Sequence, residues 1–181
     1  MLDLDKTWAL LNNADLVYSS QQVDEAVARV ASEITARLSE SYPLILSVMG
    51  GAVVFTGHLL PLMRFPLDFD YVHASRYGKE TQGNELVWKV MPSESVKGRV
   101  VVVLDDILDE GMTLAAIRDK LLELGAKEVL CAVLADKDTG KKKPLKADFV
   151  GLTLPNRFVF GCGMDAYGAW RNLPEIYAMK D

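Results

Sequence analysis

Apolar residues return at helical spacing in the first part of the chain. Over residues 19–40 they recur every three or four positions with charged residues between them, which predicts an amphipathic helix. These apolar positions are Val23, Ala26, Val27, Val30, Ile34 and Leu38. Ser19 or Ser20 can cap this helix, because a serine hydroxyl accepts a hydrogen bond from a free backbone N–H. A shorter helix is expected over residues 3–12.

Continuous apolar runs indicate buried strands farther along. The strongest lie at 44–49, 99–104 and 129–134, and such runs are typical of a parallel sheet covered by helices on both faces. Further strands are expected at 67–72, 86–91, 149–152 and 158–160, and further helices at 52–62 and 113–124. The polar residues 74–85 predict a long loop. Because strands alternate with helices, the pattern predicts an α/β fold with a mainly parallel sheet flanked by helices.

Composition adds limits to this picture. The chain has 181 residues, half of them apolar and a quarter charged, so we expect one domain over 1–181 with its core at about 40–150. A net charge of −5 disfavours a nucleic-acid binder, which usually has a basic patch. The lysines at 141–143 are expected to form a solvated loop. No apolar run approaches the ~20 residues that span a membrane.

The two cysteines indicate a reducing compartment. Cys131 lies inside an apolar run, where we expect a buried thiol, and Cys162 lies in a loop between two glycines. No CxxC pair occurs, and the acidic N-terminus does not resemble a signal peptide. These features predict a cytoplasmic protein.

The segment 100–113 carries the clearest chemistry. An apolar strand leads into Asp105 and Asp106, then into an acidic turn with Gly111, and Thr113 begins a helix. Ligands of open α/β sheets bind at the carboxyl ends of strands, and a helix N-terminus there binds phosphate. Carboxylates accept hydrogen bonds from sugar hydroxyls and bind Mg²⁺. The segment therefore predicts a site for a ribose phosphate with a divalent metal. The alternative is an acidic turn after a core strand.

This order of residues resembles the phosphoribosyl diphosphate (PRPP) signature of type I phosphoribosyltransferases, and the chain resembles their hypoxanthine-guanine branch. The resemblance covers about 40–175. It implies the type I phosphoribosyltransferase fold, with a small hood formed by the N-terminal segment and about 151–181. It also implies that the ribose and its phosphate are bound by Asp105, Asp106, Asp109, Glu110, Gly111, Met112 and Thr113.

The resemblance assigns further residues by position. Diphosphate would be bound by Met49, Gly50 and Arg171, and a catalytic flap would carry Arg76 and Tyr77. The purine would be bound by Lys137, Phe158, Val159 and Asp165, and the metal Mg²⁺ by Asp165, Asp105 and Asp106. From chemistry alone, a lysine at a strand end is usually solvent-exposed. Of the two aromatic residues Phe158 and Phe160, one is expected in the core, and a base-stacking role is plausible for the other.

The reaction implied is transfer of the 5-phosphoribosyl group from PRPP to N9 of hypoxanthine or guanine. The products would be IMP or GMP and diphosphate, as in purine salvage. Asp109 would be the general base at N7 of the purine. A homodimer or homotetramer is expected, since the 19–40 helix and apolar Leu59, Leu60 and Leu62 suit an interface.

Four positions depart from the family pattern, and one of them is Met112, which stands where lysine or another polar residue is often found. Met49 stands where a lysine is usual, so this position would act through its backbone. Glu110 stands where threonine or serine is common, and we expect its carboxylate to point away from the phosphate. The pair Asp105-Asp106 replaces the commoner Glu-Asp, which shortens one side chain and keeps the charge.

Other functions remain open. One is a phosphoribosyltransferase for xanthine, adenine or a pyrimidine, although Lys137 disfavours adenine because its 6-amino group is a donor. Another is a regulatory protein that senses PRPP or nucleotides without catalysis, and binds RNA. A third is a phosphatase or kinase-like domain with an acidic Mg²⁺ loop, but the chain has no GxxxxGK[ST] motif.

Overall fold

A central sheet of six strands organises the chain. The computed structural model describes residues 3–76, 86–91 and 96–180. The strand order is β4-β3-β2-β5-β6-β7, and every neighbouring pair is parallel except the antiparallel pair β3–β4. The strands are β2 (Leu44–Val48), β3 (Asp68–Arg76), β4 (Leu86–Val90), β5 (Val100–Leu108), β6 (Glu128–Lys137) and β7 (Phe149–Leu154).

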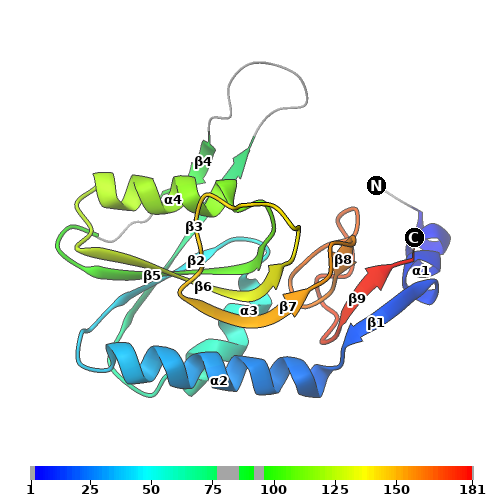
Figure 1. The fold of residues 1–181 in the computed structure, drawn as a ribbon, viewed down its shortest axis with the longest axis horizontal. Coiled ribbons are helices and arrows are strands. Elements are labelled where there is room, and N and C mark those ends of the chain that lie inside the picture. Colours follow the sequence, from blue (N-terminus) through cyan, green and yellow to red (C-terminus); the bar gives the residue numbers. More distant parts are fainter. Residues whose placement is uncertain (1–2, 77–85, 92–95, 181) are drawn as a thin grey trace.

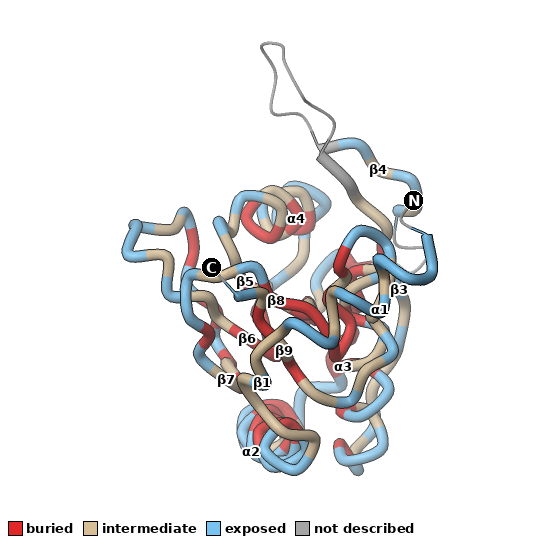
Figure 2. Tube along the Cα trace, turned by 90° about the vertical axis from the view of Figure 1, so that its right-hand side faces the viewer, coloured by how far each residue is buried: buried red, intermediate tan, exposed pale blue. Residues whose placement is uncertain are grey.

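Helices cover both faces of this sheet (Figure 1). One face is covered by α2 (Ser20–Leu38) and α3 (Val53–Leu59), which runs into a short 3-10 helix, Leu60–Leu62. The other face is covered by α4 (Met112–Glu123). Figure 2 shows the buried strands between these layers. The predicted α/β fold with a mainly parallel sheet is confirmed.

The strands of the core direct alternate residues to opposite faces. Ile45 and Val102 pack on the side of α2, and the neighbouring Leu44 and Val101 pack on the side of α4. All five residues of β2 are buried. Successive strand residues point to opposite faces, so a strand between two helical layers needs apolar residues throughout. This is why the continuous apolar runs predicted these strands correctly.

A smaller sheet joins the two ends of the chain. Its order is β1-β9-β8, all antiparallel, with β1 (Ala14–Tyr18), β8 (Val159–Phe160) and β9 (Ile176–Met179). Helix α1 (Leu4–Asn12) precedes it. The rings of Trp8 and Trp170 meet edge to face at 5.0 Å, which fixes α1 to the C-terminal segment. Sequence reasoning missed β1 and β9.

Several predicted boundaries need correction. Strand β5 continues past residue 104 to Leu108, and β6 past 134 to Lys137, because the two strands stay paired as far as Leu108 and Asp136, and Lys137 pairs with Leu154 of β7. Strand β3 continues to Arg76, since it pairs with β4, so residues 74–76 are not loop. The expected Ser19 cap is confirmed, with Gln22 completing a capping box.

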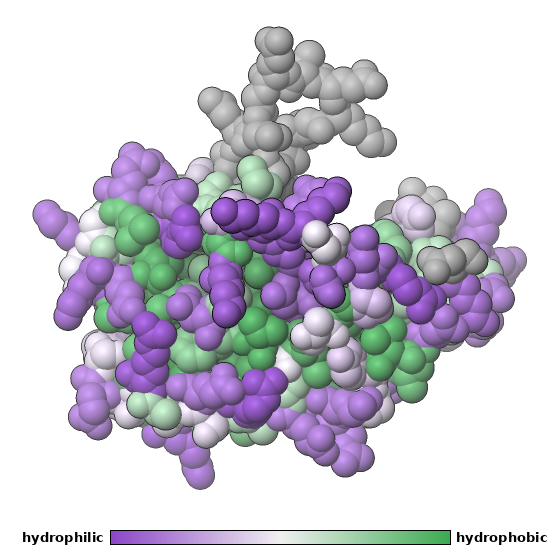
Figure 3. All heavy atoms as spheres, viewed as in Figure 1, coloured by the Kyte–Doolittle hydropathy of each residue, from purple (hydrophilic) through white to green (hydrophobic). Residues whose placement is uncertain are grey.

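The apolar surface differs in part from expectation. Leu59 is fully buried, so it is not an interface residue, whereas Leu62 is 46% exposed. Exposed aromatic side chains also occur on β3, at Phe69 and Tyr71. Figure 3 shows apolar residues between charged ones on one face. Among the described ranges, none of the helices has the length and apolar character needed to span a membrane.

Candidate functional site

The N-terminus of α4 opens into a cavity of about 430 Å³ at the carboxyl end of β5. Asp105 and residues 109–113 line it. Gly111 precedes the helix in the left-handed conformation, with φ of 78°, and no side chain caps the helix. Its first N–H groups are therefore directed at the cavity without a side-chain acceptor, and the helix dipole adds positive potential. This arrangement suits a phosphate group.

Asp105 and Asp106 lie within β5 and not in a loop. Each carboxylate accepts a hydrogen bond from the next backbone N–H, at 3.0 Å for Asp105 and 2.8 Å for Asp106. Burial raises the pKa of both groups, and the charge of Asp106 raises the pKa of Asp105 further. The nearby Arg171 opposes this rise at Asp106. A cation or hydroxyl donors would favour the charged forms.

Glycines bring three distant segments together around Asp106. A Cβ on Gly51 would overlap the Asp106 carboxylate, and a Cβ on Gly163 would overlap the carbonyl oxygen of Gly51. Gly163 also has φ of 102°, which other residues rarely adopt. The predicted diphosphate loop, whose Met49–Gly50 peptide is cis, therefore lies against the acidic pair. The Gly161-Cys162-Gly163 cluster was the only sequence signal for the role of Gly163.

The predicted metal and diphosphate residues of the C-terminal segment contact each other. The Asp165 carboxylate pairs with the Arg171 guanidinium at 2.5 Å and accepts a hydrogen bond from the N–H of Gly168 at 2.7 Å. Arg171 also donates to the carbonyl oxygen of Gly163 at 2.6 Å. Because Gly163 lies beside Asp106, this pair belongs to the same site.

Lys137 and Asp109 form the central pair of the site. The Lys137 ammonium lies 2.6 Å from the Asp109 carboxylate, so the ends of β6 and β5 are joined through these side chains. Only 12% of the Lys137 side chain is exposed, against 47% for Asp109. The general expectation of an exposed lysine at a strand end is therefore wrong here. A hydrogen-bond donor and an acceptor stand side by side next to the phosphate cavity.

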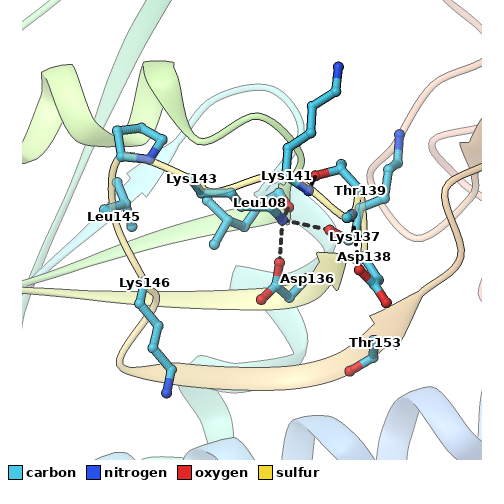
Figure 4. A pocket seen from close by; sticks show the side chains of 12 residues that line it. Leu108, Asp136, Lys137, Asp138, Thr139, Lys141, Lys143, Leu145, Lys146 and Thr153 are labelled. Atoms are coloured by element: carbon cyan, nitrogen blue, oxygen red, sulfur yellow. Dashed lines mark hydrogen bonds and ion pairs between the residues drawn. The ribbon is translucent and has the colours of Figure 1, made fainter.

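A second cavity, of about 650 Å³, lies beyond Lys137 (Figure 4). Leu108, Asp136 and Lys143 are among its lining residues. Lys143 does not belong to a solvated loop as predicted, since its side chain is only 13% exposed and is paired with Asp136. Nothing in the sequence distinguishes Lys143 from the two lysines before it, which are exposed.

The aromatic residues of the 158–160 strand separate as expected. Phe160 is fully buried, whereas Phe158 is 45% exposed and available to a ligand. One face of Phe158 stacks on Tyr167, with ring centres 5.7 Å apart and planes 15° apart. Val159 is buried. Asn156, just before this strand, shares a cavity of about 300 Å³ with Asp109, so the aromatic segment begins beside the acidic turn.

The remaining predicted residues are placed only in part. Glu110 and Met112 are exposed beside the phosphate cavity. Arg76 ends β3, and Tyr77 lies outside the described residues. Within the described part of the chain, no cluster of three or more histidine, cysteine or acidic side chains is arranged to hold a metal alone. The paired aspartates instead fit a Mg²⁺ ion completed by substrate oxygens and water, which is its common mode.

The fold and this site define a class of protein. A model of the phosphoribosyl transferase domain matches residues 13–166. The chain therefore belongs to the phosphoribosyltransferase family.

Similar proteins place the chain in the hypoxanthine-guanine branch of this family, as the sequence predicts. The hypoxanthine-guanine phosphoribosyltransferase of Bacillus subtilis is 32% identical over 167 residues, covering 91% of this chain and 92% of that protein. The hypoxanthine-guanine-xanthine phosphoribosyltransferase of Tritrichomonas foetus is 31% identical over 168 residues, covering 92% and 91%. A solved structure of a Bacillus anthracis hypoxanthine-guanine phosphoribosyltransferase has a TM-score of 0.83 at 28% identity, covering 92% and 98%.

Proposed function

We propose that this enzyme transfers the 5-phosphoribosyl group from PRPP to N9 of a 6-oxopurine, hypoxanthine or guanine, in purine salvage. The observation that carries this is the Lys137–Asp109 pair at 2.6 Å beside the phosphate cavity. A 6-oxopurine presents an acceptor, O6, and the N7 position on one edge. Lys137 donates to O6, and Asp109 accepts the N7 proton.

The same pair sets the base preference. Adenine carries a 6-amino donor where Lys137 also donates, so two donors would face each other with no acceptor between them, at a cost in binding. Xanthine also has O6 and N7, and a relative is named for xanthine as well. Xanthine is therefore the second candidate base. Phe158 stacks on the base with the face that Tyr167 leaves free.

The chemistry follows from how the site distributes charge. The anomeric carbon becomes cationic as diphosphate leaves, and Asp109 holds the N7 proton as N9 attacks, a general-base role. The backbone of residues 110–113 and the Thr113 hydroxyl hold the 5′-phosphate. Asp105 and Asp106 accept hydrogen bonds from the ribose hydroxyls. Asp165, Asp105 and Asp106, together with oxygens of the substrate, would hold a Mg²⁺ ion, which would supply positive charge against the leaving diphosphate.

Two further groups of residues complete the proposal. Met49 and Gly50 bind the diphosphate through their backbone, with Arg171 as the positive partner. The family resemblance alone assigns Arg76 and Tyr77 the role of excluding water, since hydrolysis of PRPP competes with transfer. The small sheet β1-β9-β8 acts as the hood of a single domain. We further propose that the enzyme is cytoplasmic and forms a homodimer or homotetramer, with exposed Leu62 in the interface.

A base panel tests the function directly. Purified enzyme is mixed with PRPP, Mg²⁺ and one base at a time, and nucleotide formation is followed by absorbance. Turnover of hypoxanthine and guanine, with xanthine slower and adenine inactive, is the expected result. Absence of turnover with every 6-oxopurine, together with retained PRPP binding, would instead support a PRPP-sensing regulatory protein.

A further inference from the structure

Lys143 occupies an unusual position for a lysine in a basic loop. Its ammonium donates to the carbonyl oxygen of Leu108 at 2.7 Å and to that of Lys137 at 2.6 Å. It also pairs with the Asp136 carboxylate at 2.5 Å. Figure 4 shows the Lys143 ammonium at the centre of these contacts. An ammonium has three donors, and here each one has an acceptor.

The three acceptors lie where two strands of the sheet end. Leu108 and Asp136 face each other as the last matched residues of the β5–β6 ladder. Beyond these two residues the backbones of β5 and β6 no longer pair with each other. The carbonyl oxygens at the ends of the two strands therefore need other hydrogen-bond donors. Lys143 supplies those donors to both strands at once. It therefore joins the strand ends where the ladder stops.

These strand ends carry the two side chains on which the proposed chemistry depends. Asp109 follows Leu108 directly, and Lys137 is itself one of the residues whose carbonyl oxygen is bound. The Lys143 ammonium thus contacts the backbone of Lys137 and the backbone of Leu108, the residue immediately before Asp109. The Lys137–Asp109 separation depends on how these two backbones are held relative to each other.

We propose that Lys143 is a positioning residue for recognition of the purine base, a role that rests on the proposed function. It contacts no reacting atom and acts by fixing the strand ends from which Asp109 and Lys137 project. Asp136 balances its charge, which makes a nearly buried ammonium acceptable at this place. Lys143 itself does not line the phosphate cavity, and the N–H groups that begin α4 there belong to residues 111–113, so PRPP binding is expected to depend less on Lys143 than base binding does.

The test compares Lys143→Met with the control Lys146→Met. Methionine keeps most of the length of the lysine side chain and removes all three donors. Lys146 lies on the same loop and is exposed, and Figure 4 shows its side chain pointing away from the Lys143 contacts. Circular dichroism and Tm first establish that both variants fold, and kinetics are measured well below the lower Tm.

Misplacement of reacting groups by about 1 Å can cost about 100-fold in rate. For Lys143→Met we expect kcat/KM for hypoxanthine to fall about 10-fold to 100-fold, with KM for PRPP changed less than about twofold. Lys146→Met is expected to match the parent enzyme in kcat/KM for hypoxanthine and in KM for PRPP. If Lys143→Met does not fold, Lys143→Arg replaces it, since it keeps the charge beside Asp136 but not the compact geometry. The same selective loss, smaller in size, is expected.

Two results would overturn the positioning role. One is a folded Lys143 variant with parental kinetics, which would leave Lys143 with a purely stabilising function. The other is an equal loss for hypoxanthine and PRPP. Failure of the proposed function is a separate outcome, because the parent enzyme would then turn over no 6-oxopurine before any variant is compared.

Discussion

Replacement of Lys137 by methionine tests the centre of the proposed site. The change removes the ammonium that lies 2.6 Å from the Asp109 carboxylate, and keeps a side chain of similar length. Asp109 is half exposed, so solvent screens this ion pair and its loss is expected to cost no more than about 1 kcal/mol of folding free energy. The variant is therefore expected to fold and to show a Tm close to that of the parent.

The effect on catalysis is expected to be larger than the effect on stability. A hydrogen bond that involves a charged group contributes about 1.5–3 kcal/mol, and a factor of ten in rate corresponds to about 1.36 kcal/mol. Loss of the Lys137 donor to O6 thus predicts a fall of about 10-fold to 150-fold in kcat/KM for hypoxanthine. The discrimination against adenine is expected to shrink by a similar factor, since the unmatched ammonium is gone.

Steady-state kinetics with each substrate varied in turn provide the assay. The KM for PRPP is expected to change less than about twofold, because Lys137 lies outside the phosphate cavity. Equal losses for hypoxanthine and PRPP would refute the base-recognition role. Unchanged selectivity for hypoxanthine over adenine would refute it as well.

Three further outcomes are expected. Asp109→Asn should lower turnover about 10²-fold to 10⁴-fold with PRPP binding retained, and unchanged turnover in steady-state assays would remove the general-base role. Burial raises the pKa of Asp105 well above 3.8, so the folded state binds this proton more tightly than the unfolded state does. The free energy of unfolding therefore falls as pH rises from about 3.8 through the raised pKa. Asp105→Asn should therefore raise Tm by an amount that grows with pH in calorimetric scans, and a gain independent of pH would contradict this cause. Burial raises the pKa of the Cys131 thiol to about 12 and that of Cys162 to about 11; a thiol reagent should modify both only after unfolding, and rapid reaction of the folded enzyme would disprove their protection.

The central sheet and the candidate phosphate site follow closely from the sequence. Apolar runs identified the core strands because a strand covered on both faces has no polar positions. The acidic pair and Gly111 predicted the candidate site because they interrupt the apolar pattern. Charged residues and a glycine at the end of a buried strand do not stabilise the core. Both kinds of signal are local in sequence.

What the sequence did not predict depends on contacts between distant segments. Strands β1 and β9 are short, and each is defined by its pairing with a strand at the other end of the chain. The burial of Lys143 arises from strand ends 6 to 35 residues away. Gly163 is required by the carbonyl group of Gly51. None of these contacts leaves a periodic pattern that could be read before folding.

The length of β5 has a consequence for the timescale of motion in the site. Active-site residues are most often carried by loops, which open locally long before a protein unfolds. Here Asp105 and Asp106 belong to a central strand that pairs with β6 as far as Leu108. Their backbone is released only when the sheet itself separates. The acidic pair is therefore expected to share the slow amide exchange of the core, and in the proposed mechanism substrate entry would be governed by segments other than β5.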